Sequence, residues 1–455
     1  MADKLRKGDI IQLPIDDLAL TGRSVGRHND FVVMVDRGLP GETVECRIKL
    51  TKRRYALAEF TRLISASPLR IEPRCRHFDE CGGCVWQNLD YTEQLRFKTS
   101  FVTEALARIG KVTGIAVDPP VAAPDPFFYR NKMEYSFGFR DGAPAAGMHV
   151  RGRFDAIFDM QECFLQSERG VAALRLVRAT AQRLGIPNYD DRSGAGQLRV
   201  LVVREGKLTG DFMLNVVTLD RDFAGRDELF QAIIAGVPDL TALFHTVNGR
   251  KAHVAIGEEL IPVFGQTYLT EMIGDLKFQV TPFSFFQTNS RQTRALYDVI
   301  KDHAAPEPTQ EILDLFCGCG TISLYLARHV HHVFGIEISA ESIAMARRNA
   351  ELNNLVNVEF QSGDVRRLLV DLAAQPGRFH TIITDPPRAG MEQKAITRIA
   401  RLQPRRIVAV SCNPATLARD LELFADAGYR ALRVTPVDMF PQTAHIEAVA
   451  TLVPI

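Results

Sequence analysis

From residue 281 to the end of the chain, short apolar runs alternate with segments of helical spacing, and this alternation constrains the fold most. The runs are EILDLF, VFGIEI, TIITD and RIVAVS, and helical segments such as Ala340–Leu352 and Pro414–Ala427 follow them. Such alternation predicts an α/β architecture in which helices cover a parallel sheet. Residues 281–455 are therefore expected to form one Rossmann-like domain.

The size and composition of the chain set the outer bounds. Its 455 residues suffice for about two to four domains, and 46% hydrophobic and 24% charged residues are ordinary for a globular protein. Since the formal charge is only +1, any nucleic-acid surface must be local. The N-terminus MADKLRKGDI lacks the apolar core of a signal peptide, and no run reaches the ~18 apolar residues of a membrane span. We therefore expect a cytoplasmic monomer without a membrane segment.

Residues 1–62 are predicted to form a small β-barrel, because short β segments are separated by glycine-rich turns. The charged run RIKLTKRR fits either a solvated edge strand, which charges protect from aggregation, or a nucleic-acid surface. The region resembles a TRAM domain, an OB-like module attached to RNA-modifying enzymes. The expected β segments are Asp9–Leu13, Phe31–Val35, Thr43–Leu50 and Tyr55–Thr61.

Residues 63–280 have a β-rich pattern with one predicted helix, Tyr91–Ile109, and a group of cysteines. In a reducing cytosol, such cysteines favour metal or catalytic use over disulfides. Zinc and an iron–sulfur cluster both accept four thiolates, and the spacing does not distinguish them. A fourth thiolate would close the cluster, which argues against radical chemistry at an open iron. The predicted ligands are Cys75, Cys81, Cys84 and Cys163.

A ligand-binding loop follows the first apolar run of the C-terminal region, in LFCGCGT. Gly318 and Gly320 let the backbone approach a ligand at the carboxyl end of the sheet. Glu337 ends the next strand, where an acid can hold ribose hydroxyls of either NAD or S-adenosylmethionine. Acids at four successive strand ends favour the methyl donor, and this pattern resembles the class I S-adenosylmethionine-dependent methyltransferases. The four acids are Asp314, Glu337, Asp364 and Asp385.

Cys412 lies where the run RIVAVS ends and a helix begins, with Asn413 as its cap and Pro414 as its first residue. The helix dipole and the backbone N–H groups at this position favour a thiolate. A buried, inert cysteine is the alternative, but the place beside the expected methyl donor favours a nucleophile. Addition of sulfur to C6 of a uracil would make C5 able to take a methyl group.

A base must then remove the proton from C5 before the thiolate leaves. The final segment QTAHIEAVATLV places His445 and Glu447 on one side of a predicted strand. Polar groups on the solvent side of a hairpin are the alternative interpretation. Glu447 is the preferred base, and His445 is the second candidate.

Several motifs together resemble the uracil-5 RNA methyltransferases over most of the chain: FFQTN, LFCGCGTISL, DPPRAG, SCNPATLARDL and the terminal HIEAVA. The resemblance implies that Cys412 forms a covalent C6 adduct and that Glu447 accepts the C5 proton. It also places Phe285 near the target base, although this residue fits equally well as one apolar side chain of PFSFF. The implied contacts to S-adenosylmethionine are Gln287, Phe316, Thr321, Glu337, Asp364 and Asp385.

Within this family, the RumA-type enzymes methylate a uridine of 23S ribosomal RNA and combine a TRAM barrel, a cysteine set and a catalytic domain. The resemblance therefore implies a 4Fe–4S cluster on the four cysteines and 23S ribosomal RNA as the partner. Enzymes that methylate transfer RNA are the nearest alternative and are expected to lack the barrel and the cluster. A cytosine-5 enzyme would place a cysteine where Arg388 stands, and a non-catalytic iron–sulfur RNA sensor would not need nucleophile, base and acids together.

Overall fold

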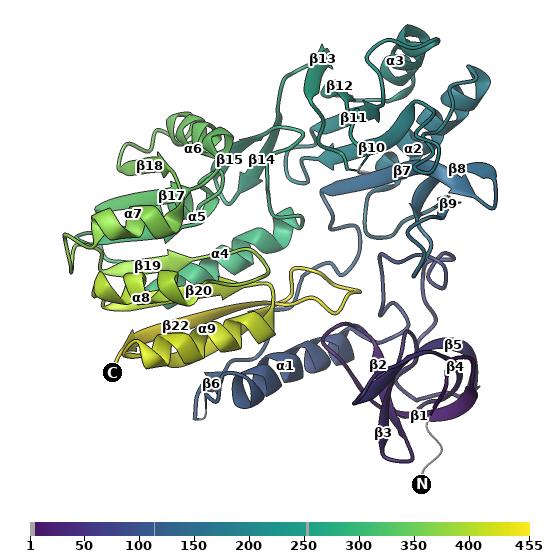
Figure 1. Cartoon of the computed structure of the whole chain (residues 1–455). Coiled ribbons are helices and arrows are strands. Elements are labelled where there is room, and N and C mark those ends of the chain that lie inside the picture. Colours follow the sequence, from purple (N-terminus) through teal and green to yellow (C-terminus); the bar gives the residue numbers. More distant parts are fainter. Residues whose placement is uncertain (1–4, 113, 252–253) are drawn as a thin grey trace.

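The structure is a computed structural model that describes residues 5–112, 114–251 and 254–455. Three β assemblies follow one another along the chain: a closed five-stranded barrel, a seven-stranded sheet and an eight-stranded sheet (Figure 1). A two-stranded hairpin stands between the last two. The described chain begins at the barrel, and the C-terminus lies at the far side of the eight-stranded sheet.

The barrel has the strand order β1-β2-β3-β5-β4. Burial alternates along its strands, and the inward side chains form a separate small core that includes Leu13, Val33 and Val44. The four predicted β segments are strands, and β2, which includes a glycine and a charged residue, was not predicted. The strands are β1 (Ile10–Leu18), β2 (Ser24–His28), β3 (Phe31–Val35), β4 (Thr43–Thr51) and β5 (Tyr55–Ser65).

The seven-stranded sheet has the order β13-β12-β11-β10-β7-β8-β9. Its strands β10 and β11 are buried along their whole length, and two helices, α2 and α3, share its hydrophobic core. The sequence prediction lacks these two helices, although apolar residues recur in α2 at helical spacing. The elements are β7 (Lys132–Arg140), β8 (Ala143–His149), β9 (Ile157–Asp159), α2 (Glu168–Arg183), β10 (Leu198–Glu205), β11 (Phe212–Thr218), α3 (Arg226–Gly236), β12 (Ala242–Val247) and β13 (Glu259–Gly265); the hairpin is β14 (Leu269–Ile273) and β15 (Leu276–Val280).

The eight-stranded sheet has the order β18-β17-β16-β19-β20-β22-β21-β6. Strands β16 to β20 pair in parallel, as the alternating sequence pattern predicted, and β22 joins β20 in antiparallel orientation. The elements are α4 (Ser290–Ala304), β16 (Glu311–Leu315), α5 (Thr321–Ala327), β17 (His332–Glu337), α6 (Ala340–Leu352), β18 (Val358–Ser362), α7 (Val365–Leu372), β19 (Thr381–Thr384), α8 (Gln393–Arg401), β20 (Arg406–Ser411), α9 (Pro414–Asp426), β21 (Tyr429–Val437) and β22 (Glu447–Pro454).

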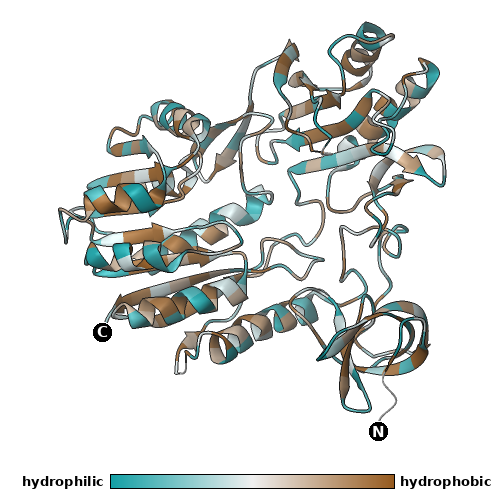
Figure 2. Ribbon diagram, viewed as in Figure 1, coloured by the Kyte–Doolittle hydropathy of each residue, from teal (hydrophilic) through white to brown (hydrophobic). Residues whose placement is uncertain are grey.

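Helices cover both faces of this sheet. Apolar side chains of α4, α5 and α6 form one core with the strands, and those of α7, α8 and α9 form a second core on the opposite face. Figure 2 shows hydrophobic strands inside and hydrophilic residues on the outer turns of the helices. This is the layered α/β architecture that the sequence predicted.

The helix α1 (Tyr91–Arg108) and the strand β6 (Ala116–Val117) precede the seven-stranded sheet in the chain but pack with the eight-stranded one. The helix contributes Val102 and Leu106 to the core beside α9, and β6 pairs with β21. Its buried face also holds two polar side chains, Gln94 and Lys98, which apolar spacing alone did not reveal. Part of the predicted region 63–280 therefore packs with the sheet formed by residues 281–455. The domain boundaries at 62 and 280 stay predictions.

Within the described ranges, none of the helices combines the length and the apolar character that crossing a membrane requires.

Candidate active site

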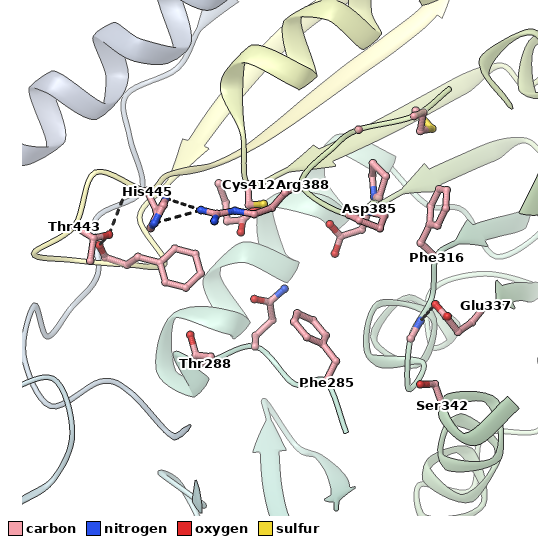
Figure 3. A pocket seen from close by; sticks show the side chains of 18 of the residues that line it. Phe285, Thr288, Phe316, Glu337, Ser342, Asp385, Arg388, Cys412, Thr443 and His445 are labelled. Atoms are coloured by element: carbon pink, nitrogen blue, oxygen red, sulfur yellow. Dashed lines mark hydrogen bonds between the residues drawn. The ribbon is translucent and has the colours of Figure 1, made fainter. Parts of the chain in front are cut away.

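A cavity of about 970 Å³ lies at the carboxyl ends of the parallel strands β16 to β20. Ligands bind at this edge in open α/β sheets, because the loops there leave a crevice between strand ends and helix starts. The wall is completed from outside the sheet by Thr21, which follows β1, by Gly82 and Gly83 between the cysteines, and by Arg130. Figure 3 shows side chains from several elements pointing into this space.

The first loop of the cavity runs from β16 into α5. Phe316 has a φ of 65° and Gly318 a φ of 54°, so the chain turns in the left-handed region where glycine is favoured. The backbone N–H of Gly318 donates to Oε2 of Glu337 (3.3 Å; Figure 3), and the N–H of Ser339 donates to Oε1 (2.9 Å). The Glu337 carboxylate is therefore fixed at the end of β17, where its remaining lone pairs face the cavity.

Three of the four predicted strand-end acids line the cavity: Glu337, Asp364 and Asp385. Asp364 caps α7 through the N–H of Arg366 (2.8 Å) and pairs with its guanidinium (2.8 Å), which lowers the pKa of Asp364 to about 2. Desolvation instead raises the pKa of Asp385 to about 7.

The fourth acid, Asp314, is fully buried beneath the cavity and is absent from its wall. It accepts a hydrogen bond from Oγ of Ser323 (2.5 Å), and burial raises its pKa to about 7. This side chain therefore supports the loop from below rather than facing a ligand.

Of two further residues that were predicted to contact the cofactor, one lines the cavity and the other does not. Gln287, in the segment before α4, lines the cavity together with Phe316. Thr321 does not line it: its hydroxyl is paired with the hydroxyl of Tyr297 (2.6 Å) at the start of α5. The contact of Thr321 with the cofactor stays a prediction. Ser342 in the first turn of α6 lines the cavity and was not predicted.

Cys412 lies between β20 and α9 and its side chain reaches the cavity (Figure 3). The predicted cap is present: Oδ1 of Asn413 accepts from the N–H of Ala415 (3.1 Å), and Pro414 is the first helical residue. The thiol pKa is nevertheless raised, first by desolvation and then by the charge of Glu447, while Arg388 opposes both. The helix terminus was expected to favour a thiolate, whereas burial beside a carboxylate shifts the pKa of this thiol upward.

Glu447 is the first residue of β22 and is only 5% exposed at the cavity wall. Burial and the neighbouring charge of Asp385 raise its pKa to about 8, although Arg388 lowers it. Near neutral pH the carboxyl group therefore exchanges protons readily, which a general base or acid requires.

His445 precedes β22 and lies on the same cavity wall. The guanidinium of Arg388 donates to its Nδ1 (2.8 Å), as Figure 3 shows. Desolvation and then the charge of Arg388 lower the pKa of His445 to about 4. A neutral ring with an occupied nitrogen is a weaker proton acceptor than Glu447, which agrees with the predicted ranking of the two residues.

Arg388 connects the reactive groups, a role that was not predicted from the sequence. Its guanidinium lies beside both Cys412 and His445, and its carbonyl accepts from Nδ2 of Asn413 (3.3 Å) and from Oγ1 of Thr416 (3.3 Å). The sequence feature that could have indicated this role is the DPPR run, which stands directly after a predicted strand.

Comparisons with known proteins decide the family. A family model described as tRNA (Uracil-5-)-methyltransferase matches residues 263–453, and a TRAM domain model matches residues 4–61. Proteins named as RNA methyltransferases from Halalkalibacterium halodurans and Chlorobaculum tepidum are 38% and 39% identical to this chain. The first match covers 98% of both chains, and the second covers 98% of this chain and 97% of the relative. The chain belongs to the RNA uracil-5-methyltransferase family.

A solved structure agrees with this family. The tRNA (uracil-54, C5)-methyltransferase of Pyrococcus abyssi, in complex with S-adenosyl-L-homocysteine, superposes with a TM-score of 0.79 at 30% identity. The match covers 97% of this chain and 99% of that one, so it includes the barrel region. The eight-stranded sheet thus has the class I methyltransferase fold and the N-terminal barrel is a TRAM barrel, as predicted. The expectation that enzymes acting on transfer RNA lack the barrel is wrong for this relative.

The four predicted metal ligands of this family member approach one another in space. Each of Cys75, Cys81 and Cys84 has a raised pKa, chiefly from burial, with a further contribution from the charge of Cys163. Two of the sulfur atoms accept hydrogen bonds: Cys81 Sγ from the N–H of Gly83 (3.3 Å) and Cys84 Sγ from Nε2 of Gln87 (3.2 Å). In the part of the chain that the structure describes, however, no three Cys, His, Asp or Glu side chains are arranged to hold a metal ion.

Proposed function

We propose that this protein transfers a methyl group from S-adenosylmethionine to C5 of a uridine in 23S ribosomal RNA. The observation that carries the proposal is that one cavity holds Cys412 and Glu447 next to a row of carboxylates at the strand ends. The Pyrococcus abyssi relative in complex with S-adenosyl-L-homocysteine supports the choice of methyl donor.

The cofactor half of the cavity consists of Phe316, Glu337 and Asp364, with Gln287 and Asp385 toward the reactive half. When bound there, S-adenosylmethionine supplies an electrophilic methyl group. Glu337, fixed by two backbone N–H groups, is suited to accept hydrogen bonds from ribose hydroxyls. Asp364, with a pKa of about 2, stays ionised and can accept from an amino group.

In the reactive half, the Cys412 thiol gives up its proton to solvent, and the resulting thiolate adds to C6 of the uracil. Electron density then moves to C5, which forms a bond to the methyl group as the bond between methyl and sulfonium breaks. Glu447 takes the proton from C5, the double bond between C5 and C6 returns, and the bond between C6 and sulfur breaks. Arg388 lowers the pKa of the attacking thiol by its charge and by a hydrogen bond.

The substrate base needs a stacking partner once it leaves its RNA helix. Phe285 lines the cavity and is 68% exposed, so its ring is free to pack on an unstacked uracil. The TRAM barrel supplies Thr21 to the same wall, and we propose that it guides the RNA toward the cavity.

Transfer RNA is the second candidate substrate. It is favoured by the relative from Pyrococcus abyssi, which is named for uracil-54 of transfer RNA and matches this chain almost from end to end. Incubating the protein with transcripts of both RNAs and mapping 5-methyluridine tests the choice. We expect methylation of the 23S fragment; methylation of transfer RNA alone would overturn that part of the proposal.

We also propose a 4Fe–4S cluster held by Cys75, Cys81, Cys84 and Cys163. Four thiols are the donor set that such a cluster takes, and Cys84 lies within electrostatic reach of the other three, although the side chains are not arranged around a common point; Arg151 donates to the carbonyls of Cys81 (3.0 Å) and Cys84 (2.6 Å). Protein purified without oxygen should contain iron and sulfide. Stoichiometric zinc would contradict the cluster. A monomeric state and a cytoplasmic location stay predictions.

The nucleophile is tested with RNA that carries 5-fluorouridine, whose C5 has no proton for a base to remove after methylation. The wild-type protein should accumulate a methylated, covalent protein–RNA adduct on a denaturing gel, and Cys412→Ala should form none. Cys46→Ala, a buried cysteine of the barrel, serves as the matched control and should be trapped like the wild type. Equal trapping of wild type and Cys412→Ala would overturn the assignment.

A further inference from the structure

The loop between β21 and β22, residues 438–446, forms one side of the cavity and leads directly into Glu447. Phe440, Thr443, Ala444 and His445 of this loop line the cavity. Connecting loops usually run over the surface and are more mobile than the elements that they join. This one is held mainly by side chains and backbone groups from distant parts of the chain.

Four consecutive carbonyl groups of the loop each accept a hydrogen bond from a different segment. Those of Met439 and Phe440 accept from Asn289 Nδ2 (3.2 Å) and Lys98 Nζ (3.0 Å). Those of Pro441 and Gln442 accept from the hydroxyl of Tyr129 (3.0 Å) and from the N–H of Val85 (3.0 Å). The loop therefore has one conformation that satisfies all of these donors together.

Gln94 of α1 lies at the centre of this arrangement. Its Oε1 accepts from the N–H of Gln442 (2.9 Å), and its Nε2 donates to Oε1 of Gln442 (3.0 Å). The same Nε2 group also bonds the carbonyls of Trp86 (3.0 Å) and Leu89 (2.9 Å). Both glutamines are buried, and Gln442 has a φ of 68°, a conformation that an ordinary side chain adopts only when its surroundings impose it.

One turn further along α1, Lys98 forms an ion pair with Asp438 (2.7 Å) in which both side chains are fully buried. The hydroxyl of Tyr91 donates to the second oxygen of the same carboxylate (3.0 Å). Buried ion pairs and amides add little net stability, but they penalise every arrangement that leaves them unpaired. Their effect here is to select one position of the loop.

We propose that Gln94 and Gln442 are positioning residues that hold the 438–446 loop over Glu447, so that the base stays buried and aimed at C5 of the target uracil. This inference rests on the proposed function, because it assigns their role through Glu447. The segment that carries three of the four cysteines takes part, since the N–H groups of Val85 and Trp86, directly after Cys84, both bond the carbonyl of Gln442.

Release of the loop should change how elimination depends on pH. The groups that face Glu447 are Asp385 after β19, Arg388 in the following loop, Cys412 after β20 and His445 on its own loop. Release of the loop would admit water to Glu447 without removing any of these four groups from the protein. Because burial is the main reason that the pKa of Glu447 is raised to about 8, release should lower it.

The test is single-turnover kinetics of Gln94→Leu with ordinary uridine RNA, in which formation and decay of the covalent adduct are followed on denaturing gels across pH. We expect decay to slow about tenfold at high pH, with its pH midpoint about one unit lower, while adduct formation and S-adenosylmethionine affinity stay close to wild type. Asn215→Leu is the control, since Asn215 is a fully buried amide bonded to Thr246 in the seven-stranded sheet.

Gln442→Met tests the same pair from the loop side and should reproduce the effect if Gln94→Leu is too unstable to purify. Gln94→Glu keeps the acceptor for the N–H of Gln442 and should restore part of the decay rate. A decay rate and pH midpoint equal to those of wild type, or an equal loss in Asn215→Leu, would overturn the inference. Failure of the wild type to form any adduct would instead contradict the proposed function.

Discussion

In the cofactor half of the cavity Asp364 is bonded to a backbone N–H and to Arg366, and its pKa is lowered to about 2. In the reactive half Glu447 lies buried beside Asp385, and its pKa is raised to about 8. The two carboxylates belong to one sheet and one cavity, yet one is kept ionised and the other is kept able to gain a proton. The contrast indicates that burial and neighbouring groups set the protonation of each carboxylate, and it underlies the proposed division of the cavity into a cofactor half and a reactive half.

The change with the largest expected effect removes the proton acceptor of the reactive half. Glu447→Gln should still allow Cys412 to add and C5 to be methylated, but elimination should slow by ~10²- to 10⁴-fold. The covalent adduct should therefore accumulate with ordinary uridine RNA, which denaturing gels and mass spectrometry detect. Glu392→Gln, an acid on the cofactor side of the same wall, is the control and should show no accumulation. Rapid turnover by Glu447→Gln would contradict the assignment of Glu447 as the proton acceptor of the reactive half.

The second-largest expected difference between the two halves is in their pH dependence: that of elimination in the reactive half and that of cofactor binding in the cofactor half. The acceptor form of Glu447 is the carboxylate, so elimination should speed up as the pH rises through about 8. The contribution of Asp364 to S-adenosylmethionine affinity, measured as the ratio of the affinities of wild type and Asp364→Asn, should stay nearly constant between about pH 5 and 9, because Asp364 remains ionised throughout this range. Single-turnover rates and calorimetric titrations over pH measure the two quantities. A cofactor affinity that follows the same profile as elimination would contradict the division.

The raised pKa of Glu447 also predicts how stability changes with pH. A carboxyl group whose pKa is higher in the folded state binds its proton more tightly there, so its contribution is present below about pH 4.5 and is lost as the pH rises to about 8. Glu447→Gln should remove this loss and raise the free energy of unfolding at pH 8 by about 1–3 kcal/mol, with little change at pH 4. Urea unfolding at the two pH values checks it; an equal shift at both would speak against the buried carboxyl as the cause.

On the cofactor side we expect a smaller effect. Asp364→Asn keeps a good helix cap for α7 but loses the negative charge that pairs with Arg366. S-adenosylmethionine should bind about 3- to 30-fold more weakly, with the elimination rate unchanged. Isothermal titration with the cofactor and the adduct-decay assay report the two effects separately. A change in elimination without a change in cofactor affinity would reverse the assignment of this half.

Thr321→Val should have the smallest effect. Its hydroxyl bonds Tyr297 and does not reach the cavity wall, so we expect cofactor affinity within about twofold of wild type and only ~1 kcal/mol lower stability. Tyr297→Phe is the matched change on the other partner and should behave alike. A tenfold loss of cofactor affinity in Thr321→Val, without a similar loss in Tyr297→Phe, would indicate that Thr321 does contact the cofactor.

Much of the fold followed from local patterns. Parallel strands, the helix starting at Pro414 with its Asn413 cap, and the barrel segments were all readable, because alternation, capping residues and turn glycines act over a few residues. The helices α2 and α3 and the packing of α1 against α9 were not predicted. Apolar spacing indicates that a helix has a buried face, but it does not say which sheet will cover that face.

For the cavity, the sequence by itself determined which strand ends carry acids and where the single nucleophile candidate stands, since the carboxyl ends of parallel strands share one edge. Only the tertiary structure decided how each group behaves. Asp314 is buried below the cavity, Thr321 is turned to Tyr297, and Arg388 lies beside Cys412 and His445. Burial and charge at each position depend on segments far apart in the chain, such as α1 and the 438–446 loop, and no short-range pattern specifies those distances.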